Sequence, residues 1–408
     1  MFPPEPEKPW WHHLMWALPC MMATGLLGYW LNSPSAKEVE KIVEVPQIIY
    51  RTNTVTVSMP VTNPLPQVGS EITNLPSNTN NYFAQRGVPV RTNRTAALRI
   101  GLTDPNEAVR AAPGHDVAAI DFVARAAQTD FEVQVALDRL GFSPGSIDGL
   151  TGPQTKAALE AYQHCNGLPV TGIVDQATRN KLLLTAPALL ERTVMPEDLA
   201  RLHSLGLSWT EKSKQTALEF ESVLEMFAEE HHCSPRYLMR LNPTVAWNEV
   251  TPGTKVKLPN TAMPRPQMKA ELIHIQLSQR TLDVYDGATN LVARFPCSIA
   301  TRMDRRPVGR LEITNVAEAA DYTFDPARFP KSPEALAGGG KLTIPPGPNN
   351  PVGTTWMSLS RAGYGIHGTP DPEKIGRTTS LGCFRLSNWN AQHLVKMVRV
   401  GTVVLVAQ

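Results

Sequence analysis

Apolar and polar residues follow different patterns in successive parts of the chain. Residues 14–31 form an apolar run without a charged side chain, and residues 32–128 show no sustained period. Apolar residues recur at helical spacing in 129–187 and 206–262, whereas residues 270–408 alternate apolar and polar positions as β-strands do. The pattern predicts a multidomain α+β protein in which helical units precede a β-rich C-terminal domain.

The apolar run at residues 14–31 is long enough to cross a membrane. Helices that span a bilayer need roughly 20 apolar residues, and aromatic residues gather at the interfaces. Aromatic residues lie at both ends of this run, with Trp10 and Trp11 before it and Tyr29 and Trp30 in its last turn. We predict an uncleaved transmembrane helix, with residues 1–13 in the cytoplasm and everything after the run exported. A cleaved signal segment is the alternative.

Residues 32–128 are rich in threonine, asparagine and proline and contain few aromatic residues. Such a composition buries too little apolar surface to offset the entropy that is lost when a chain becomes ordered. This segment is therefore predicted to be a disordered or extended linker.

Residues 129–187 predict a small three-helix domain. Val133, Leu137 and Leu140 fall on one face of the first helix, and Pro153 suits the first turn of the second. Asp175 is a suitable N-cap for the third helix.

Six segments in residues 270–408 have the alternation typical of strands. They read LIHIQL, TLDVYDG, LVARFPCSIA, LEITNV, TWMSLS and GTVVLVA, and a helix is predicted at 389–398. These elements predict a β-sandwich-like domain. Residues 325–351 form a loop rich in proline and glycine, and a loop of that length predicts a lid or the wall of a substrate groove.

Charge and cysteine content argue against two classes of function. The chain has 39 basic and 37 acidic residues, a net charge of +2, so it lacks the positive excess typical of nucleic-acid-binding proteins. Its cysteines are widely spread: Cys20, Cys165, Cys233, Cys297 and Cys383. None has the spacing of zinc ligands, so a structural metal site is not expected.

The stretch at 366–386 carries the candidate chemistry. It contains His367 and, further on, Cys383 within the sequence SLGCFR. A thiol attacks as the thiolate, and imidazole is well suited to take its proton near neutral pH. Gly382 allows the backbone to bring N–H groups close to a reacting carbonyl. The stretch predicts a cysteine acyl-transfer site, and the simpler alternative is a buried cysteine near an unrelated histidine.

Two helical segments resemble cell-wall-binding modules. Residues 129–187 resemble the peptidoglycan-binding three-helix domain through LG at 140–141, DG at 148–149, GP at 152–153, NGLP at 166–169 and TG at 171–172. Residues 206–262 resemble the second half of a LysM glycan-binding module through LMRLNP and TPGTKVKLPN, but the usual opening strand is missing. We interpret this second segment as a degenerate, mainly structural LysM-like unit.

Residues 270–408 resemble the catalytic domain of L,D-transpeptidases. The matching pieces are PVG at 307–309, NPVG at 350–353, GYGIHGT at 363–369 and SLGCFRL at 380–386, followed by Asn388. In that family a cysteine attacks the L,D peptide bond of a peptidoglycan tetrapeptide stem, releases D-alanine and leaves a thioester on diaminopimelate. The side-chain amine of an acceptor stem then resolves the thioester, which gives a diaminopimelate–diaminopimelate crosslink without a cofactor.

The resemblance implies roles for particular residues. Cys383 is the nucleophile, His367 is the base, and the backbone carbonyl of Gly368 orients the imidazole. The N–H groups of Gly382 and Cys383 form the oxyanion hole. The substrate-binding candidates are Arg385, Ser380, Tyr364 and Trp356.

The favoured interpretation is a peptidoglycan L,D-transpeptidase of cell wall biogenesis and remodelling. It implies a periplasmic enzyme anchored in the inner membrane, or one secreted to the cell wall if residues 14–31 are cleaved. Peptidoglycan stems are its expected donor and acceptor. Two alternatives stay open: an L,D-carboxypeptidase or endopeptidase that resolves the same acyl-enzyme with water, and a non-catalytic peptidoglycan tether.

Overall fold

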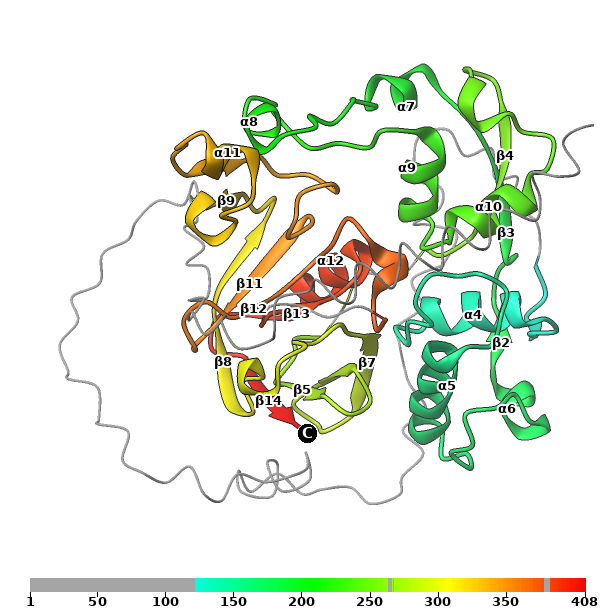
Figure 1. Ribbon diagram of the computed structural model, residues 1–408. Coiled ribbons are helices and arrows are strands. Elements are labelled where there is room, and N and C mark those ends of the chain that lie inside the picture. The colour runs from blue at the N-terminus through cyan, green and yellow to red at the C-terminus, as the bar shows by residue number, and fades with distance from the viewer. Residues whose placement is uncertain (1–121, 263–265, 267, 378–381) are drawn as a thin grey trace, which may run out of the picture. The chain divides into compact units, whose positions relative to one another are not determined.

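The structure is a computed structural model (Figure 1). It describes residues 122–262, 266, 268–377 and 382–408, all of which fall within one compact unit. The predicted cytoplasmic segment 1–13, the predicted membrane helix 14–31 and most of the linker lie outside these residues. Among the residues that are described, no helix is both long and apolar enough to cross a membrane.

Three helices form the first described domain: α4 (Asp130–Arg139), α5 (Pro153–Cys165) and α6 (Gln176–Lys181). Thr129 caps α4, because its hydroxyl oxygen accepts the N–H of Glu132 at 3.2 Å. Asp175 caps α6 as predicted, and accepts the N–H of Thr178 at 2.7 Å. Pro153 occupies the first turn of α5, where a missing N–H costs no helical hydrogen bond.

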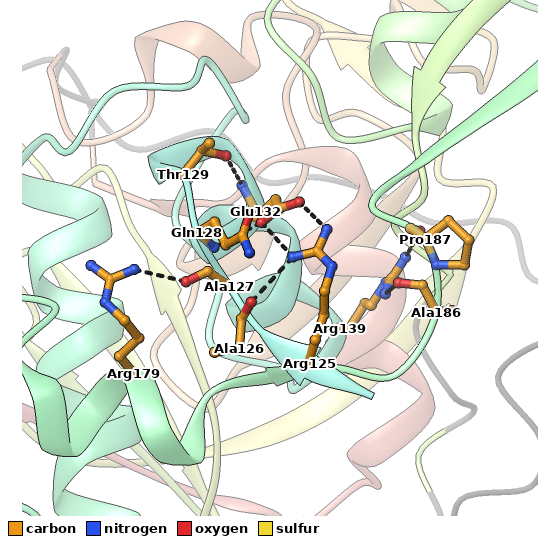
Figure 2. Close-up of polar contacts among 10 residues, drawn as sticks. All are labelled: Arg125, Ala126, Ala127, Gln128, Thr129, Glu132, Arg139, Arg179, Ala186 and Pro187. Atoms are coloured by element: carbon orange, nitrogen blue, oxygen red, sulfur yellow. Dashed lines mark hydrogen bonds and ion pairs between the residues drawn. The ribbon is translucent and has the colours of Figure 1, made fainter. Parts of the chain in front are cut away.

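The described part of the segment predicted to be linker, residues 122–128, contains a short strand. Strand β1 (Arg125–Ala126) pairs antiparallel with β2 (Leu183–Leu184). Figure 2 shows the Arg125 guanidinium held by the Glu132 carboxylate, with an Nη1–Oε2 distance of 2.9 Å. In the same view Arg139 donates to the backbone carbonyls of Ala186 and Pro187. These contacts hold the chain segments before and after the three helices against α4.

The next unit has the order strand, helix, helix, strand. Its elements are β3 (Leu189–Thr193), α9 (Val223–Glu230), α10 (Pro235–Leu241) and β4 (Lys255–Pro259), and β3 pairs antiparallel with β4. Residues 206–262 contain no opening strand, as predicted, and β4 pairs instead with β3. Strand β3 lies upstream of 206–262, because residues 194–222, with the short helices α7 (Pro196–Ala200) and α8 (Trp209–Lys212), separate it from α9.

Eight strands of the C-terminal domain form one mixed sheet. They are β5 (Leu272–Gln276), β6 (Thr281–Tyr285), β7 (Leu291–Pro296), β8 (Gly309–Glu318), β11 (Thr355–Leu359), β12 (Gly365–His367), β13 (Phe384–Arg385) and β14 (Val403–Ala407). Their order is β13-β12-β11-β8-β14-β5-β6-β7. The six predicted strands correspond to β5, β6, β7, β8, β11 and β14. Strands β12 and β13 are too short for an alternation to reveal them.

A single sheet takes the place of the two facing sheets of a sandwich. The reason is β14, which pairs with β5 on one side and β8 on the other and so joins strands from the whole domain. Helix α12 (Asn388–Met397) covers one face, where Ala391, Leu394 and Val395 enter the main apolar core. The predicted helix at 389–398 is thereby confirmed.

The loop at 325–351 is largely ordered. Strand β9 (Tyr322–Phe324), just before the loop, pairs antiparallel with β10 (Leu342–Ile344) inside it, and the short helix α11 (Pro333–Leu336) lies between the two strands. Short 3-10 helices lie at Trp247–Glu249, Met303–Arg305, Pro326–Arg328 and Pro372–Lys374.

Candidate active site

The strand register places the predicted nucleophile and base on one face of the sheet. Strands β12 and β13 are parallel, with His367 opposite Arg385. Because side chains alternate along a strand, Cys383, two residues before Arg385, is on the same face as Arg385 and His367. The intervening Ile366 and Phe384 point the other way, into the main apolar core. The sheet thus brings together two residues that a long loop separates in the sequence.

The His367 imidazole is held in one orientation. Its Nδ1 lies 2.6 Å from the carbonyl oxygen of Gly368, so Nδ1 carries the hydrogen and donates it. The indole of Trp356, its partner across β11 and β12, stacks on it with ring centroids 5.1 Å apart. In the neutral tautomer that this bond selects, Nε2 has a lone pair that can accept a proton.

Burial keeps both reacting groups neutral. Burial lowers the pKa of His367 to about 3, and the positive charge of Arg385 acts in the same direction. Burial raises the pKa of the Cys383 thiol to about 11, although the Gly365 backbone and the Arg385 charge oppose it. The resting site therefore holds a thiol and a neutral imidazole, so the thiol would have to lose its proton before or during any attack.

Arg385 is anchored through its backbone and keeps a partly exposed side chain. Its N–H donates to the carbonyl of Ser298 at 3.0 Å, and its carbonyl accepts from Ser298 at 2.9 Å. Within the described ranges no carboxylate pairs with its guanidinium. A guanidinium close enough to lower the pKa of the thiol is suited to bind a carboxylate of the substrate.

The other predicted site residues are placed differently. Trp356 is 2% exposed beneath His367, and Tyr364 is 5% exposed in the main core. A Cβ on Gly382 would lie 3.3 Å from the Tyr364 ring, so the glycine permits the loop to approach that ring closely. Direct substrate contact by Trp356 and Tyr364 stays a prediction. Ser380 lies outside the described residues.

Sequence reasoning gave no role to Asn388, which lies at the centre of the site's backbone. It is fully buried, and its Oδ1 accepts the N–H groups of Thr369 at 3.0 Å and Thr354 at 3.2 Å. A Cβ would come within 1.9 Å of this oxygen at Gly353 and within 2.2 Å at Gly368. Glycine is therefore required at positions 353 and 368, because the Asn388 side chain approaches both closely.

Sequence reasoning also missed the contribution of residues before the catalytic domain. Leu218 is fully buried in a cluster that includes Tyr322 and Trp356 and against which Cys383 packs. Its N–H donates to the carbonyl of Pro346 at 2.8 Å, and its carbonyl accepts from Asn349 at 3.0 Å. A lone leucine in a loop gives no sequence signal of such a contact.

The described ranges contain neither a metal-binding cluster nor a disulfide. No group of three or more histidine, cysteine, aspartate or glutamate side chains there is placed to hold a metal ion. Cys165, Cys233, Cys297 and Cys383 form no disulfide with one another. The acidic residues that follow His367 are engaged away from it: Asp371 pairs with Lys374, and Glu373 accepts from Ser234.

Comparison with known proteins gives two family matches. Residues 270–406 match the L,D-transpeptidase catalytic domain of the YkuD family, and residues 131–182 match the "Putative peptidoglycan binding domain". The second match covers the three-helix domain. Together with the register of β12 and β13, the first match assigns the histidine and cysteine to one catalytic domain.

Individual relatives match part of the chain. A protein of Bacillus licheniformis named "Putative L,D-transpeptidase YkuD" is 27% identical over 44% of this chain and 90% of its own length. A Fuscovulum blasticum L,D-transpeptidase homologue is 38% identical over 28% of this chain and 56% of its own. Among solved structures, an L,D-transpeptidase from Mycobacterium smegmatis aligns over 38% of this chain and 64% of its own, at 21% identity and a TM-score of 0.27. The family match identifies residues 270–406 as an L,D-transpeptidase catalytic domain of the YkuD family.

Proposed function

We propose that this protein is a peptidoglycan L,D-transpeptidase that works through a thioester on Cys383. The observation that carries the proposal is the common face of His367 and Cys383, with the histidine locked by the Gly368 carbonyl. The family match at 270–406 supplies the reaction class.

In the first half-reaction the donor stem is cleaved. The Cys383 sulfur attacks the carbonyl of the L,D peptide bond while its proton moves to Nε2 of His367. Backbone N–H groups at Gly382 and Cys383 stabilise the negative oxygen of the tetrahedral intermediate. The C–N bond then breaks, the imidazolium returns its proton to the departing D-alanine amine, and the diaminopimelate acyl group remains on sulfur.

In the second half-reaction an amine replaces the sulfur. The side-chain amine of diaminopimelate on an acceptor stem attacks the thioester, His367 takes one of its protons, and the C–S bond breaks. The thiol is regenerated with the proton from His367, and the new bond is a diaminopimelate–diaminopimelate crosslink. Arg385 binds a carboxylate of the stem, because its guanidinium lies beside the thiol and no described carboxylate neutralises it.

The same proposal places the protein at the cell wall. The uncharged apolar run at 14–31 supports an inner-membrane anchor, and the segment that follows it supports a periplasmic spacer. The peptidoglycan-binding domain at 131–182 would hold the polymer that the catalytic domain modifies. A reporter that is active only in the periplasm, fused after Gln408, should be active; an inactive reporter would contradict export.

Product analysis distinguishes transfer from hydrolysis. Purified protein incubated with disaccharide-tetrapeptide should yield crosslinked dimers with the diaminopimelate–diaminopimelate bond by mass spectrometry. Shortened stems without dimers would show that the protein is a carboxypeptidase. Unchanged substrate would leave the non-catalytic peptidoglycan tether as the remaining function. Cys165→Ala is the matched control, because Cys165 is a partly buried thiol in the three-helix domain and should not be needed.

A further inference from the structure

One peptide group beside the histidine is fixed from both of its sides. The carbonyl between Gly368 and Thr369 accepts the Nδ1–H of His367 at 2.6 Å, and the N–H of the same peptide donates to Oδ1 of Asn388 at 3.0 Å. A peptide that donates at one end becomes a stronger acceptor at the other, because hydrogen bonds in a chain polarise one another. The orientation of His367 therefore depends on the position of the Asn388 amide.

The Asn388 amide is itself fixed from outside the catalytic domain. Its Nδ2 donates to the carbonyl of Pro348 at 3.1 Å and to Oε1 of Glu229 at 2.7 Å. Pro348 belongs to the catalytic domain, but Glu229 is the penultimate residue of α9 in the preceding unit. All four hydrogen-bonding positions of this buried amide are thus occupied, and one of the partners comes from another unit.

Helix α9 is held where this contact requires it. Glu225, one turn before Glu229, accepts the side-chain amide of Asn349 at 2.5 Å, and Ser234 beyond the helix donates to Glu373 at 2.7 Å. Glu230 faces its own unit instead and pairs with Arg192 and Arg201. Glu229 therefore contacts the catalytic domain and the adjacent Glu230 does not, so a Glu230 variant is a matched control.

We propose that Glu229 is a positioning residue for the transpeptidase reaction, acting through Asn388 and the Gly368–Thr369 peptide to orient His367. The relay takes the place of the acid in a Cys-His-Asp arrangement, with a neutral peptide in contact with the imidazole. Because of it, the strand–helix–helix–strand unit of residues 189–259 completes the active site. This inference rests on the proposed function, in which His367 is the base.

The protonation of Glu229 suits a neutral relay. Burial raises the pKa of this carboxyl to about 8, and the nearby Glu225 and Glu230 act in the same direction, while the hydrogen bond from Asn388 opposes them. At neutral pH the group is mostly protonated, and its Oε1 still accepts from Asn388. Glutamine has the same shape and the same acceptor, so it should replace this residue.

Three variants of the full chain test the relay. Glu229→Gln keeps the acceptor, Glu229→Met removes it at similar volume, and Glu230→Ala breaks the two arginine pairs on the same helix. The rate constant for acylation of Cys383 by tetrapeptide should fall about tenfold or more in Glu229→Met, since small misplacements of catalytic groups cost up to about 100-fold. It should stay within about twofold of wild type in the other two, with apparent substrate affinity unchanged in all three.

A second readout does not need turnover. The nitrogen NMR signals of His367 should show hydrogen on Nδ1 in wild type and Glu229→Gln, and a mixture of tautomers in Glu229→Met. Equal acylation rates and tautomers in all folded variants would overturn the relay, as would an equal loss in Glu230→Ala. If wild type itself is not acylated, the proposed function fails, whereas the tautomer comparison still decides whether Glu229 positions the histidine.

Discussion

His367 and Arg385 face each other across the parallel pair β12 and β13. The guanidinium lowers the pKa of the imidazole, which burial has already lowered, so His367 is neutral above pH of about 3. The same charge lowers the pKa of Cys383, but burial outweighs it. The site therefore differs from cysteine enzymes that rest as a thiolate–imidazolium pair.

The neutral pair predicts how Cys383 reacts with iodoacetamide. Only the thiolate reacts, and its fraction rises about tenfold per pH unit below the thiol pKa of about 11, so the rate constant should climb steadily from pH 7 to 10. Cys383→Ala gives the background of the other thiols, among which burial raises the pKa of Cys165 to about 12. A plateau already reached at pH 7 would show a resting thiolate and contradict the neutral pair.

Replacing Arg385 by methionine should weaken substrate binding. Loss of a charge-assisted hydrogen bond costs about 1.5–3 kcal/mol, so the apparent KM for tetrapeptide should rise roughly 10- to 100-fold. Arg310→Met is the control, because Arg310 is an exposed strand residue paired with Glu312. An unchanged KM in Arg385→Met would mean that the guanidinium does not bind the stem.

Gly368→Ala should displace the groups that hold His367 in place. The added Cβ would lie 2.2 Å from Oδ1 of Asn388, so either the asparagine or the peptide that holds His367 must move. Overpacking of this kind costs about 1–3 kcal/mol of folding free energy, and acylation should fall with it. Gly287→Ala has open space around its Cβ and should match wild type in melting temperature and acylation.

The Glu229 carboxyl predicts a pH dependence of stability. Its pKa is raised from 4.5 to about 8 in the folded chain, so the folded state keeps a proton that the unfolded state loses. Its contribution is complete below pH of about 4.5 and is lost as pH rises to about 8. The melting temperature of wild type should therefore fall relative to Glu229→Gln across this window. Parallel curves for the two proteins would contradict the raised pKa.

Long periodic elements and local motifs could be predicted from the sequence. The alternation of 272–277 and 401–407 identified β5 and β14, and His367, Gly382 and Cys383 predicted a cysteine acyl-transfer site. The pairing of β14 between β8 and β5 could not be predicted, because no local pattern fixes which strands become neighbours. That pairing is why the domain has one sheet.

The surroundings of the site were also beyond sequence reasoning. Asn388 was noted beside the motif, but its bonds to Thr354 and Thr369 depend on the folded path of three loops. Glu229 and Leu218 reach the site from outside the catalytic domain, and ordinary residue types at long sequence separation leave no pattern. The sequence could thus supply the candidate nucleophile and base, which stay predictions, but not the residues that contact them from outside the motif.

The most direct test of the central claim is mass spectrometry of the protein after incubation with disaccharide-tetrapeptide. Wild type should gain the mass of the stem without its terminal D-alanine, and peptide mapping should place that mass on Cys383. His367→Ala should acquire the adduct far more slowly, and Cys383→Ala should acquire none. An adduct of the same mass on Cys383→Ala, or one mapped to another residue of the wild type, would contradict the assignment of Cys383 as the nucleophile.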